Sequence, residues 1–197
     1  MRLTENQIKQ VFFDIESDDR ESVLLKALQH HQPTSCVVFC NRKQQCSDVA
    51  RFLNQQGISA KAIHGDLEQN ERDLVLTQFA NKSCSVLIAT DVAARGLDIK
   101  DLPMVVNFEL SHDPEVHIHR IGRTGRAGTQ GVAVSLFKLS EMPKVLAIEN
   151  ECGLELPMES VSDLDTSKSF NPKPPMVTIC INGGRKDKLR AGDILGA

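Results

Sequence analysis

The sequence contains no tryptophan and no tyrosine, and only eight phenylalanines. Stacking of bases on aromatic rings is therefore not the main way in which this chain could bind a nucleic acid. No stretch approaches about 18 consecutive apolar residues, and the opening MRLTENQIKQ lacks the apolar core of a secretion signal, so we expect neither a membrane span nor a leader. Basic residues number 23 against 26 acidic ones, a net charge of −3. This balance excludes a uniformly basic coat, and any contact with phosphate must come from locally placed cations.

The six cysteines show none of the spacings typical of functional cysteine sites. They form no Cys-x-x-Cys pair, and most lie inside apolar segments. The spacing matches neither a zinc site nor a disulfide framework. We expect no metal site, and we interpret the cysteines as small buried residues of a protein in a reducing cytoplasm.

The periodicity of apolar residues alternates between two kinds along most of the 197-residue chain, a length that suits one α/β domain. Strand-like runs occur at 8–16, 35–40, 59–63, 85–89, 104–108 and 132–137. Helical spacing follows Asp18 and Asp19, and it recurs at 42–56, 69–80, 114–121 and 141–151. Short joints between alternating strands and helices predict an α/β fold, a parallel sheet with helices on both faces.

The composition changes after about residue 160. Residues 161–175 are rich in Ser, Asp, Lys and Pro and are typical of a linker. Beyond them, 176–181 has the pattern of one more strand, followed by a polar turn and a helix. We therefore expect a domain at 1–160, a linker at 161–175, and the truncated start of another domain at 176–197.

Ligands of parallel sheets bind beyond the carboxyl ends of the strands. In this sequence those joints are 41–42, 64–66, 90–98 and 111–114, which we expect along one edge of the sheet. The most informative segment, HRIGRTGRAG at 119–128, carries Arg120, Arg123 and Arg126 at every third position with glycines between them. Arginine suits recognition of phosphate oxygens, and glycine lets a backbone approach a ligand closely. A solvated basic loop explains the same spacing equally well.

Three further segments follow strands. In ATDVAARGLDIKDL at 89–102, Thr90 and Asp91 stand where they could meet a phosphate or simply cap a short helix, and Asp98 could accept hydrogen bonds from ribose hydroxyls. In HGDLEQNER at 64–72, taken alone, Asp66 is better explained as a helix cap and Arg72 as a surface residue. VVFCNRKQQCSDVA at 37–50, taken alone, is better explained as a turn before an amphipathic helix.

The order of these four segments is far more specific than any one of them. VVFCN, HGD with QxxR, ATDVAARGLD and HRIGRTGR resemble motif IV, the QxxR element and motifs V and VI of the DEAD-box RNA helicases. The resemblance covers about residues 8–155 and implies the second, C-terminal RecA-like domain, which has a P-loop NTPase-type fold. The linker and MVTICINGGRKDKLRAGDILGA resemble the start of the RRM-like RNA-binding domain in the DbpA group of bacterial helicases.

The resemblance implies roles for individual residues. Arg123 and Arg126 would be arginine fingers that reach the γ-phosphate of ATP, and Gly96 and Asp98 would contact the nucleotide. The residues that would hold the RNA sugar–phosphate backbone are Arg42, Gly65, Arg72, Thr90 and Arg95, although many family members have threonine at the position of Arg42. His119 and Arg120 would couple the ATP and RNA sites, whereas His117 matches no family role and is expected to be a packing or surface residue.

The sequence has no G-x-x-x-x-G-K-[ST] phosphate loop, no Asp-Glu-Ala-Asp and no Ser-Ala-Thr. The resemblance thus implies that ATP with Mg²⁺ is bound mainly by an N-terminal RecA-like domain of the same protein, and that this chain alone does not hydrolyse ATP. The whole protein would be an ATP-dependent RNA helicase, a hydrolase that unwinds short RNA duplexes. The DbpA likeness implies large-subunit ribosomal RNA as the target and ribosome biogenesis as the role.

Two other functions remain open at this point. A superfamily-2 DNA helicase or translocase shares the second RecA-like domain, although the HRIGRTGR and ARGLD segments favour the RNA-directed branch. A non-catalytic RNA-binding module is the other alternative, and it predicts RNA affinity that is indifferent to ATP. A Rossmann-type dehydrogenase is disfavoured because no G-x-G-x-x-G follows a strand.

Overall fold

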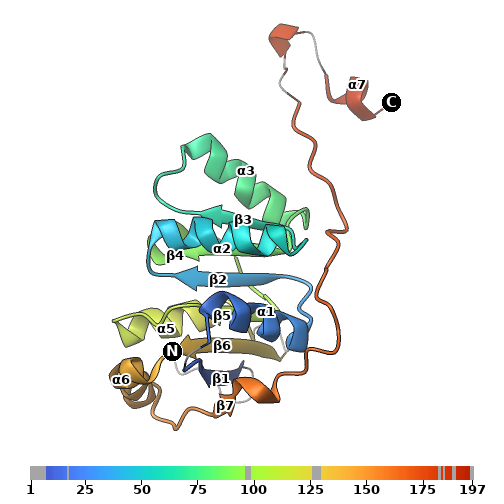
Figure 1. Cartoon of the computed structure of the whole chain (residues 1–197). Helices are drawn as coiled ribbons and strands as arrows, with labels where there is room; N and C mark the ends of the chain where they lie inside the picture. The colour runs from blue at the N-terminus through green and yellow to red at the C-terminus, as the bar shows by residue number, and fades with distance from the viewer. Residues whose placement is uncertain are drawn as a thin grey trace.

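The computed structural model of the chain describes residues 8–16, 18–95, 99–125, 130–181, 183, 185–187 and 190–195. Within them, a seven-stranded sheet has the order β3-β4-β2-β5-β6-β1-β7, and every neighbouring pair is parallel (Figure 1). The strands are β1 (Ile8–Asp14), β2 (Cys36–Cys40), β3 (Ala60–Ile63), β4 (Val86–Thr90), β5 (Met104–Asn107), β6 (Gly131–Phe137) and β7 (Met158–Ser160). The expected parallel α/β fold is confirmed, and β7 is an edge strand of three residues that the apolar pattern did not predict.

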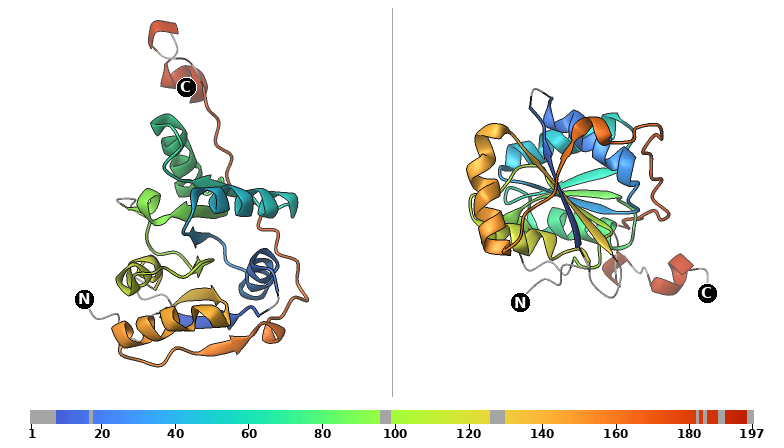
Figure 2. Two further views of the ribbon diagram at one scale, coloured as in Figure 1. Left: turned by 60° about the vertical axis from the view of Figure 1, so that its left-hand side comes forward. Right: turned by 90° about the horizontal axis from the view of Figure 1, so that it is seen from below.

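Helices follow the strands and cover both faces of the sheet (Figure 2). They are α1 (Arg20–His31), α2 (Lys43–Gln55), α3 (Gln69–Ala80), α4 (Asp91–Ala94), α5 (Pro114–Ile121), α6 (Met142–Cys152) and α7 (Ala191–Leu195), with short 3-10 helices at η1 (Leu139–Glu141), η2 (Val161–Asp163) and η3 (Arg185–Asp187).

Alternate side chains of the central strands enter different cores. In β2, Cys36 and Val38 pack with α1 and α2, whereas Val37 and Phe39 pack with α3 and α4 on the opposite face. All five residues of β2 are buried. A strand buried on both faces needs a continuous apolar run, because neither set of alternate positions meets water.

The local signals at helix ends are mostly confirmed. Asp19 caps α1: its carboxylate accepts the Ser22 hydroxyl at 2.6 Å and the backbone N–H of Ser22 at 2.8 Å, and these two hydrogen bonds lower the pKa of the carboxyl. α6 ends at Gly153, which has a φ of 69°. The expectation that Asp66 caps α3 is wrong, because Glu68 occupies that position and forms a capping box with Glu71.

Residues 164–172, which follow the last strand of the sheet, pack against the rest of the domain. Leu164 and Phe170 are buried in the same core as α1 and α2. The backbone N–H of Asp165 donates to His30 Nδ1 at 2.8 Å, and the Ser85 hydroxyl donates to the carbonyl of Pro172 at 3.3 Å. Since His30 lies near the end of α1 and Ser85 precedes β4, the segment crosses the amino edge of the sheet, along the right-hand side of Figure 1.

The expectation of a strand at 176–181 is wrong. These residues form no strand among the described residues, and Val177 and Ile179 are 84% and 79% exposed. Apolar alternation creates a strand only where a neighbouring strand supplies hydrogen bonds, and no strand in the described part of the chain pairs with 176–181. The helix expected after the polar turn is present as α7.

Candidate functional site

The candidate site lies at the carboxyl edge of the sheet, where the loops after β2, β4 and β5 meet α5. Arg120 of α5 occupies the centre of this meeting point, and only 2% of it is exposed. Its guanidinium forms a two-pronged ion pair with Asp91, at 2.6 Å from Nε and 2.7 Å from Nη2. Asp91 is the first residue of α4, so this pair ties α5 directly to the end of β4.

The same guanidinium reaches the other two loops. Nη2 donates to Asn41 Oδ1 at 2.9 Å after β2, and Nη1 donates to the carbonyl of Glu109 at 2.7 Å after β5. The ring of Phe39 lies 5.2 Å from its central carbon. Nη1 also donates to Asn107 Oδ1 at 3.3 Å, so the five N–H groups of this buried guanidinium have five acceptors. Arg120 therefore ties three loops together, and in this structure its guanidinium does not face solvent as a phosphate ligand would.

The other coupling candidate behaves differently. His119 is exposed beside the buried Arg120 on α5. His117, two residues before His119, is buried, and its Nε2 and Nδ1 lie 3.1 Å from Gln10 Oε1 and 3.4 Å from Asn107 Nδ2, respectively. Burial, aided by the charge of Arg120, lowers the pKa of His117 to about 3. His117 is thus a neutral packing residue, one of the two possibilities expected for it.

The five RNA candidates lie on or beside neighbouring strand ends. Arg42 follows β2, Gly65 follows β3, Thr90 ends β4, Arg95 follows α4, and Arg72 lies on α3. Arg42, Gly65 and Arg95 are exposed, and a Cβ on Gly65 would meet no atom within 4 Å. Arg72 Nη2 donates to the carbonyl of Ala93 at 3.5 Å, so it links α3 to α4. The structure therefore brings all five candidates to one edge of the sheet.

Polar contacts hold these neighbouring loops together. Lys43 Nζ lies 2.8 Å from Asp66 Oδ2, and this contact lowers the pKa of the Asp66 carboxyl. Ser47 Oγ lies 3.2 Å from His64 Nε2. Both pairs join the start of α2 to the loop after β3. The Thr90 hydroxyl caps α4 by accepting the N–H of Ala93 at 3.4 Å. Of the two roles expected for this residue, the helix cap is therefore present.

Of the four residues expected to contact the nucleotide, the structure describes Arg123. Its carbonyl accepts the N–H of Leu102 at 3.1 Å, and its Nη1 donates to the carbonyl of Ile99 at 3.4 Å. The next residue reinforces this contact, since the Thr124 hydroxyl donates to the carbonyl of Leu102. Gly125 then turns the chain with a φ of 67°. The turn after α5 is thus fastened to residues 99–102. Gly96, Asp98 and Arg126 lie outside the described residues.

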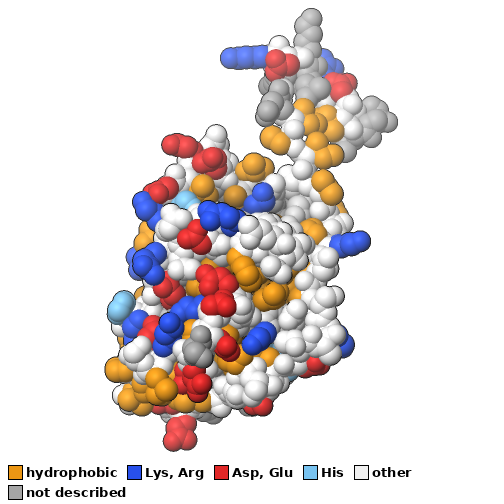
Figure 3. All heavy atoms as spheres, viewed as in Figure 1, with side chains coloured by type: hydrophobic (Ala, Val, Ile, Leu, Met, Phe, Trp, Pro, Cys, Tyr) orange, Lys and Arg blue, Asp and Glu red, His pale blue; other side chains and the backbone are white. Residues whose placement is uncertain are grey.

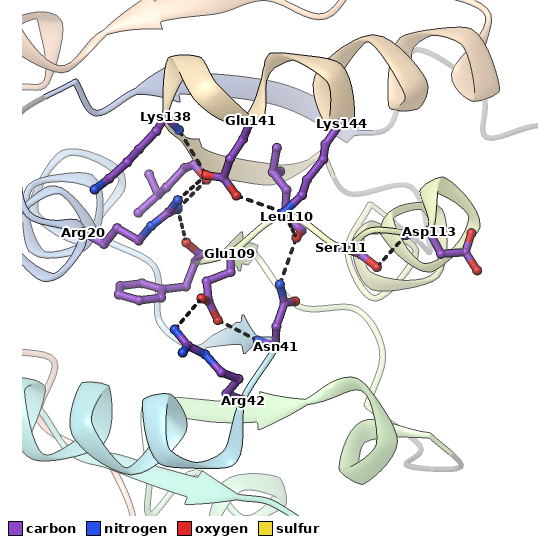
Figure 4. A network of polar contacts seen from close by, with 12 residues as sticks. Arg20, Asn41, Arg42, Glu109, Leu110, Ser111, Asp113, Lys138, Glu141 and Lys144 are labelled. Atoms are coloured by element: carbon purple, nitrogen blue, oxygen red, sulfur yellow. Dashed lines mark hydrogen bonds and ion pairs between the residues drawn. The ribbon is translucent and has the colours of Figure 1, made fainter.

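A second polar network at this edge was not anticipated from the sequence (Figure 4). Arg20, the first residue of α1, donates through Nη1 to the carbonyls of Phe108 at 2.6 Å and Leu136 at 2.8 Å. Its Nη2 pairs with Glu141, which also lies 3.1 Å from Lys144 Nζ. Burial alone would raise the pKa of Glu141, but the charge of Arg20 lowers it overall. Arg20 thereby fixes the ends of β5 and β6, although nothing in its sequence context distinguishes it from an ordinary helix residue.

Charge on the surface is mixed rather than segregated. On the face seen in Figure 3, basic and acidic side chains lie interspersed. Among the described residues, no three His, Cys, Asp or Glu side chains gather in a way that could hold a metal ion. In the same part of the chain, no helix is long and apolar enough to cross a membrane.

Comparison with known proteins agrees with this architecture. Residues 19–128 match the helicase conserved C-terminal domain. The chain is 48% identical over 190 residues to the ATP-dependent RNA helicase DbpA of Escherichia coli, which covers 96% of this chain and 41% of that protein. The chain therefore spans about two-fifths of the length of this relative.

Solved structures give the same assignment. The C-terminal domain of the DEAD-box protein Dbp5 superposes with a TM-score of 0.75 at 32% identity, covering 86% of this chain and 99% of that one. A DEAD box protein from Methanococcus jannaschii superposes with a TM-score of 0.73 at 38% identity, covering 78% of this chain and 42% of that one. The parallel sheet, the four ordered motifs and these matches show that the chain belongs to the helicase conserved C-terminal domain family, as a RecA-like C-terminal domain of the DEAD-box, DbpA type.

Proposed function

We propose that this chain is the C-terminal RecA-like half of an ATP-dependent RNA helicase, and that it supplies part of the RNA site and the arginines that act on ATP. The observation that carries the proposal is the position of Arg120, which ties the loops after β2, β4 and β5 into one unit. The name of the E. coli relative, an ATP-dependent RNA helicase, supports the same activity for the whole protein.

The RNA site would consist of Arg42, Gly65, Arg72, Thr90 and Arg95. Their common edge and the exposure of Arg42, Gly65 and Arg95 support this assignment. Arginine side chains and an uncrowded glycine backbone suit the sugar–phosphate chain, which positions a strand without reading its sequence. The RNA contacts of this domain would therefore be independent of sequence.

The nucleotide site would use Arg123 and Arg126 as arginine fingers, with Gly96 and Asp98 against the nucleotide. The attachment of the Arg123 carbonyl to Leu102 supports this assignment, because it holds the arginine-bearing turn near the chain that follows Asp98. Guanidinium groups would offset the charge that develops on the transferred phosphoryl group. An N-terminal RecA-like domain of the same protein would hold most of the ATP and Mg²⁺, so this chain alone would not hydrolyse ATP.

Coupling between the two sites would run through α5. Arg120 contacts Asp91, which is adjacent to the RNA candidate Thr90, and it lies three residues before Arg123 on the same segment. A shift of α5 on closure around ATP would therefore move the β4 loop as well. His119, exposed beside Arg120, would be the second coupling residue.

The target would be large-subunit ribosomal RNA, and the role would be ribosome biogenesis in the cytoplasm. The similarity to DbpA over 190 residues supports this, because it extends beyond the sheet into 161–197, where we place the linker and the start of an RRM-like RNA-binding domain. Specificity for one RNA would then depend on that domain rather than on the carboxyl edge of the sheet.

The experiment is strand displacement by the full-length protein on matched RNA and DNA duplexes, with Arg72→Ala and Arg95→Ala as test variants. Arg51→Ala is the control, because Arg51 is exposed on α2 and its ion pair among the described residues is a local one, with Asp48 at 3.1 Å. We expect RNA displacement that falls at least about tenfold in both test variants and is unchanged in the control. Displacement of DNA alone would favour a DNA translocase, and RNA binding indifferent to ATP would favour a non-catalytic module.

A further inference from the structure

Glu109 is an acidic residue placed inside the proposed RNA site. Its Oε2 accepts the backbone N–H of Asn41 at 2.9 Å, and its Oε1 lies 3.5 Å from Arg42 Nη2 (Figure 4). The Glu109 side chain is 16% exposed, whereas that of Arg42 is 75% exposed. A candidate phosphate ligand is therefore already paired with a carboxylate of the same chain.

The Glu109 carboxylate is held by the surrounding loops, whereas the Arg42 guanidinium with which it pairs is mostly exposed. The backbone N–H of Glu109 donates to the carbonyl of Phe39 at 3.4 Å, and its carbonyl accepts from buried Arg120 at 2.7 Å. Arg20 holds the carbonyl of the preceding residue at 2.6 Å. Glu109 is thus fixed at the end of β5, whereas most of the Arg42 side chain is open to solvent and to an incoming phosphate.

We propose that Glu109 acts as an internal competitor for RNA phosphate at Arg42. This inference rests on the proposed RNA site. In the absence of RNA, the carboxylate neutralises Arg42 and holds it against the loop. A phosphate that engages Arg42 must displace this pair and must also lie near a fixed negative charge. Glu109 therefore weakens backbone binding and reduces its dependence on salt, because Arg42 enters the complex already neutralised.

The size of the effect follows from the geometry of the pair. An ion pair with an exposed partner changes an equilibrium by about two- to fivefold. Glu109→Gln removes the charge and retains an oxygen that can accept the N–H of Asn41. We expect this variant to bind single-stranded RNA about two- to fivefold more tightly than the unmodified chain, with a salt dependence steeper by up to about 0.7 in logarithmic slope.

The test is fluorescence anisotropy of a labelled single-stranded oligouridine with the 197-residue chain across a series of KCl concentrations. Glu155→Gln is the matched control, since it changes the net charge equally at an exposed residue between α6 and β7. Arg42→Ala and the double variant Glu109→Gln/Arg42→Ala complete a double-mutant cycle. The gain from Glu109→Gln is expected to disappear when Arg42 is absent, and Glu155→Gln is expected to bind as the unmodified chain does.

Three results would overturn the inference. They are unchanged or weaker binding by Glu109→Gln, a gain that persists without Arg42, and an equal gain in Glu155→Gln. Thermal unfolding establishes that each variant is folded, and Glu109→Asp, which retracts the carboxylate by one methylene and keeps its charge, is expected to show a smaller gain in the same direction. If RNA affinity falls in Arg72→Ala and Arg95→Ala but is unchanged in Glu109→Gln, only the inference fails. If neither the unmodified chain nor any variant binds RNA, the proposed RNA site fails as well.

Discussion

Replacing Arg120 by methionine is expected to destabilise the whole carboxyl edge. Methionine fills a similar volume but removes every donor that now reaches Asp91, Asn41 and the carbonyl of Glu109. Removing one partner of a buried ion pair costs about 3–5 kcal/mol, because the remaining charge is left without compensation. The Asp91 side chain is 25% exposed, so water offsets part of this loss, and we expect about 3 kcal/mol.

Urea unfolding of the 197-residue chain measures this loss directly. In thermal unfolding of a chain of this length, the same loss of about 3 kcal/mol corresponds to a decrease in Tm of about 6–12 °C. Arg51→Ala, which breaks only an exposed pair with Asp48, is expected to cost less than about 1 kcal/mol. Arg120→Lys keeps the charge without the planar fork and is expected to recover less than half of the loss. A loss in Arg120→Met no larger than that in Arg51→Ala would refute the assignment of Arg120 as the residue that ties the loops.

Three further changes test other parts of the structure. Phe170→Ala is expected to lower the free energy of unfolding by about 3 kcal/mol and to speed hydrogen exchange in 164–178, because Phe170 is 5% exposed in the main core. Between pH 7 and pH 5 the free energy of unfolding is expected to fall by about 2 kcal/mol because of His117, whose pKa is lowered to about 3 in the folded chain. Below about pH 6.5 this histidine takes up a proton in the unfolded state but stays neutral in the native state. Gly131→Ala is expected to cost about 1–3 kcal/mol, because its Cβ would overlap both the Thr124 hydroxyl and the backbone nitrogen of Gly125.

Each of these predictions has its own control. Faster exchange throughout the sheet in Phe170→Ala, rather than in 164–178, would contradict the docking of that segment. His117→Gln is expected to lose about 2 kcal/mol less than the unmodified chain over the same pH interval, and an identical pH dependence would show that His117 does not contribute. Gly153→Ala serves as a comparison for Gly131→Ala, since a Cβ at Gly153 meets no atom within 4 Å and only its positive φ is strained. A smaller loss at Gly131 than at Gly153 would contradict the close packing of Thr124.

The sequence predicted those features that depend on local patterns. The continuous apolar run of β2 indicated a strand buried on both faces, and the structure confirms it. Asp19 and Gly153 marked helix ends through short-range chemistry. The edge strand β7 was not predicted because it has only three residues, and none of them is buried.

Features that depend on distant contacts were not predicted. A run of three regularly spaced arginines does not show that Arg120 faces inward, since its burial depends on Asp91 and Asn41 from other loops. Leu164 and Phe170 are isolated apolar residues in a polar stretch, and only the folded core shows where they pack. The opposite error occurred at 176–181, where strand-like alternation is paired with none of the strands that the structure describes.

The central claim, that this domain supplies arginines to an RNA-dependent ATPase, is tested most directly by ATP hydrolysis in the full-length protein. The measurement compares turnover with and without ribosomal RNA for the unmodified protein, Arg126→Ala and Arg51→Ala. We expect turnover that RNA stimulates and that falls at least about 100-fold in Arg126→Ala, with Arg51→Ala unaffected. RNA-stimulated turnover that survives in Arg126→Ala would contradict it.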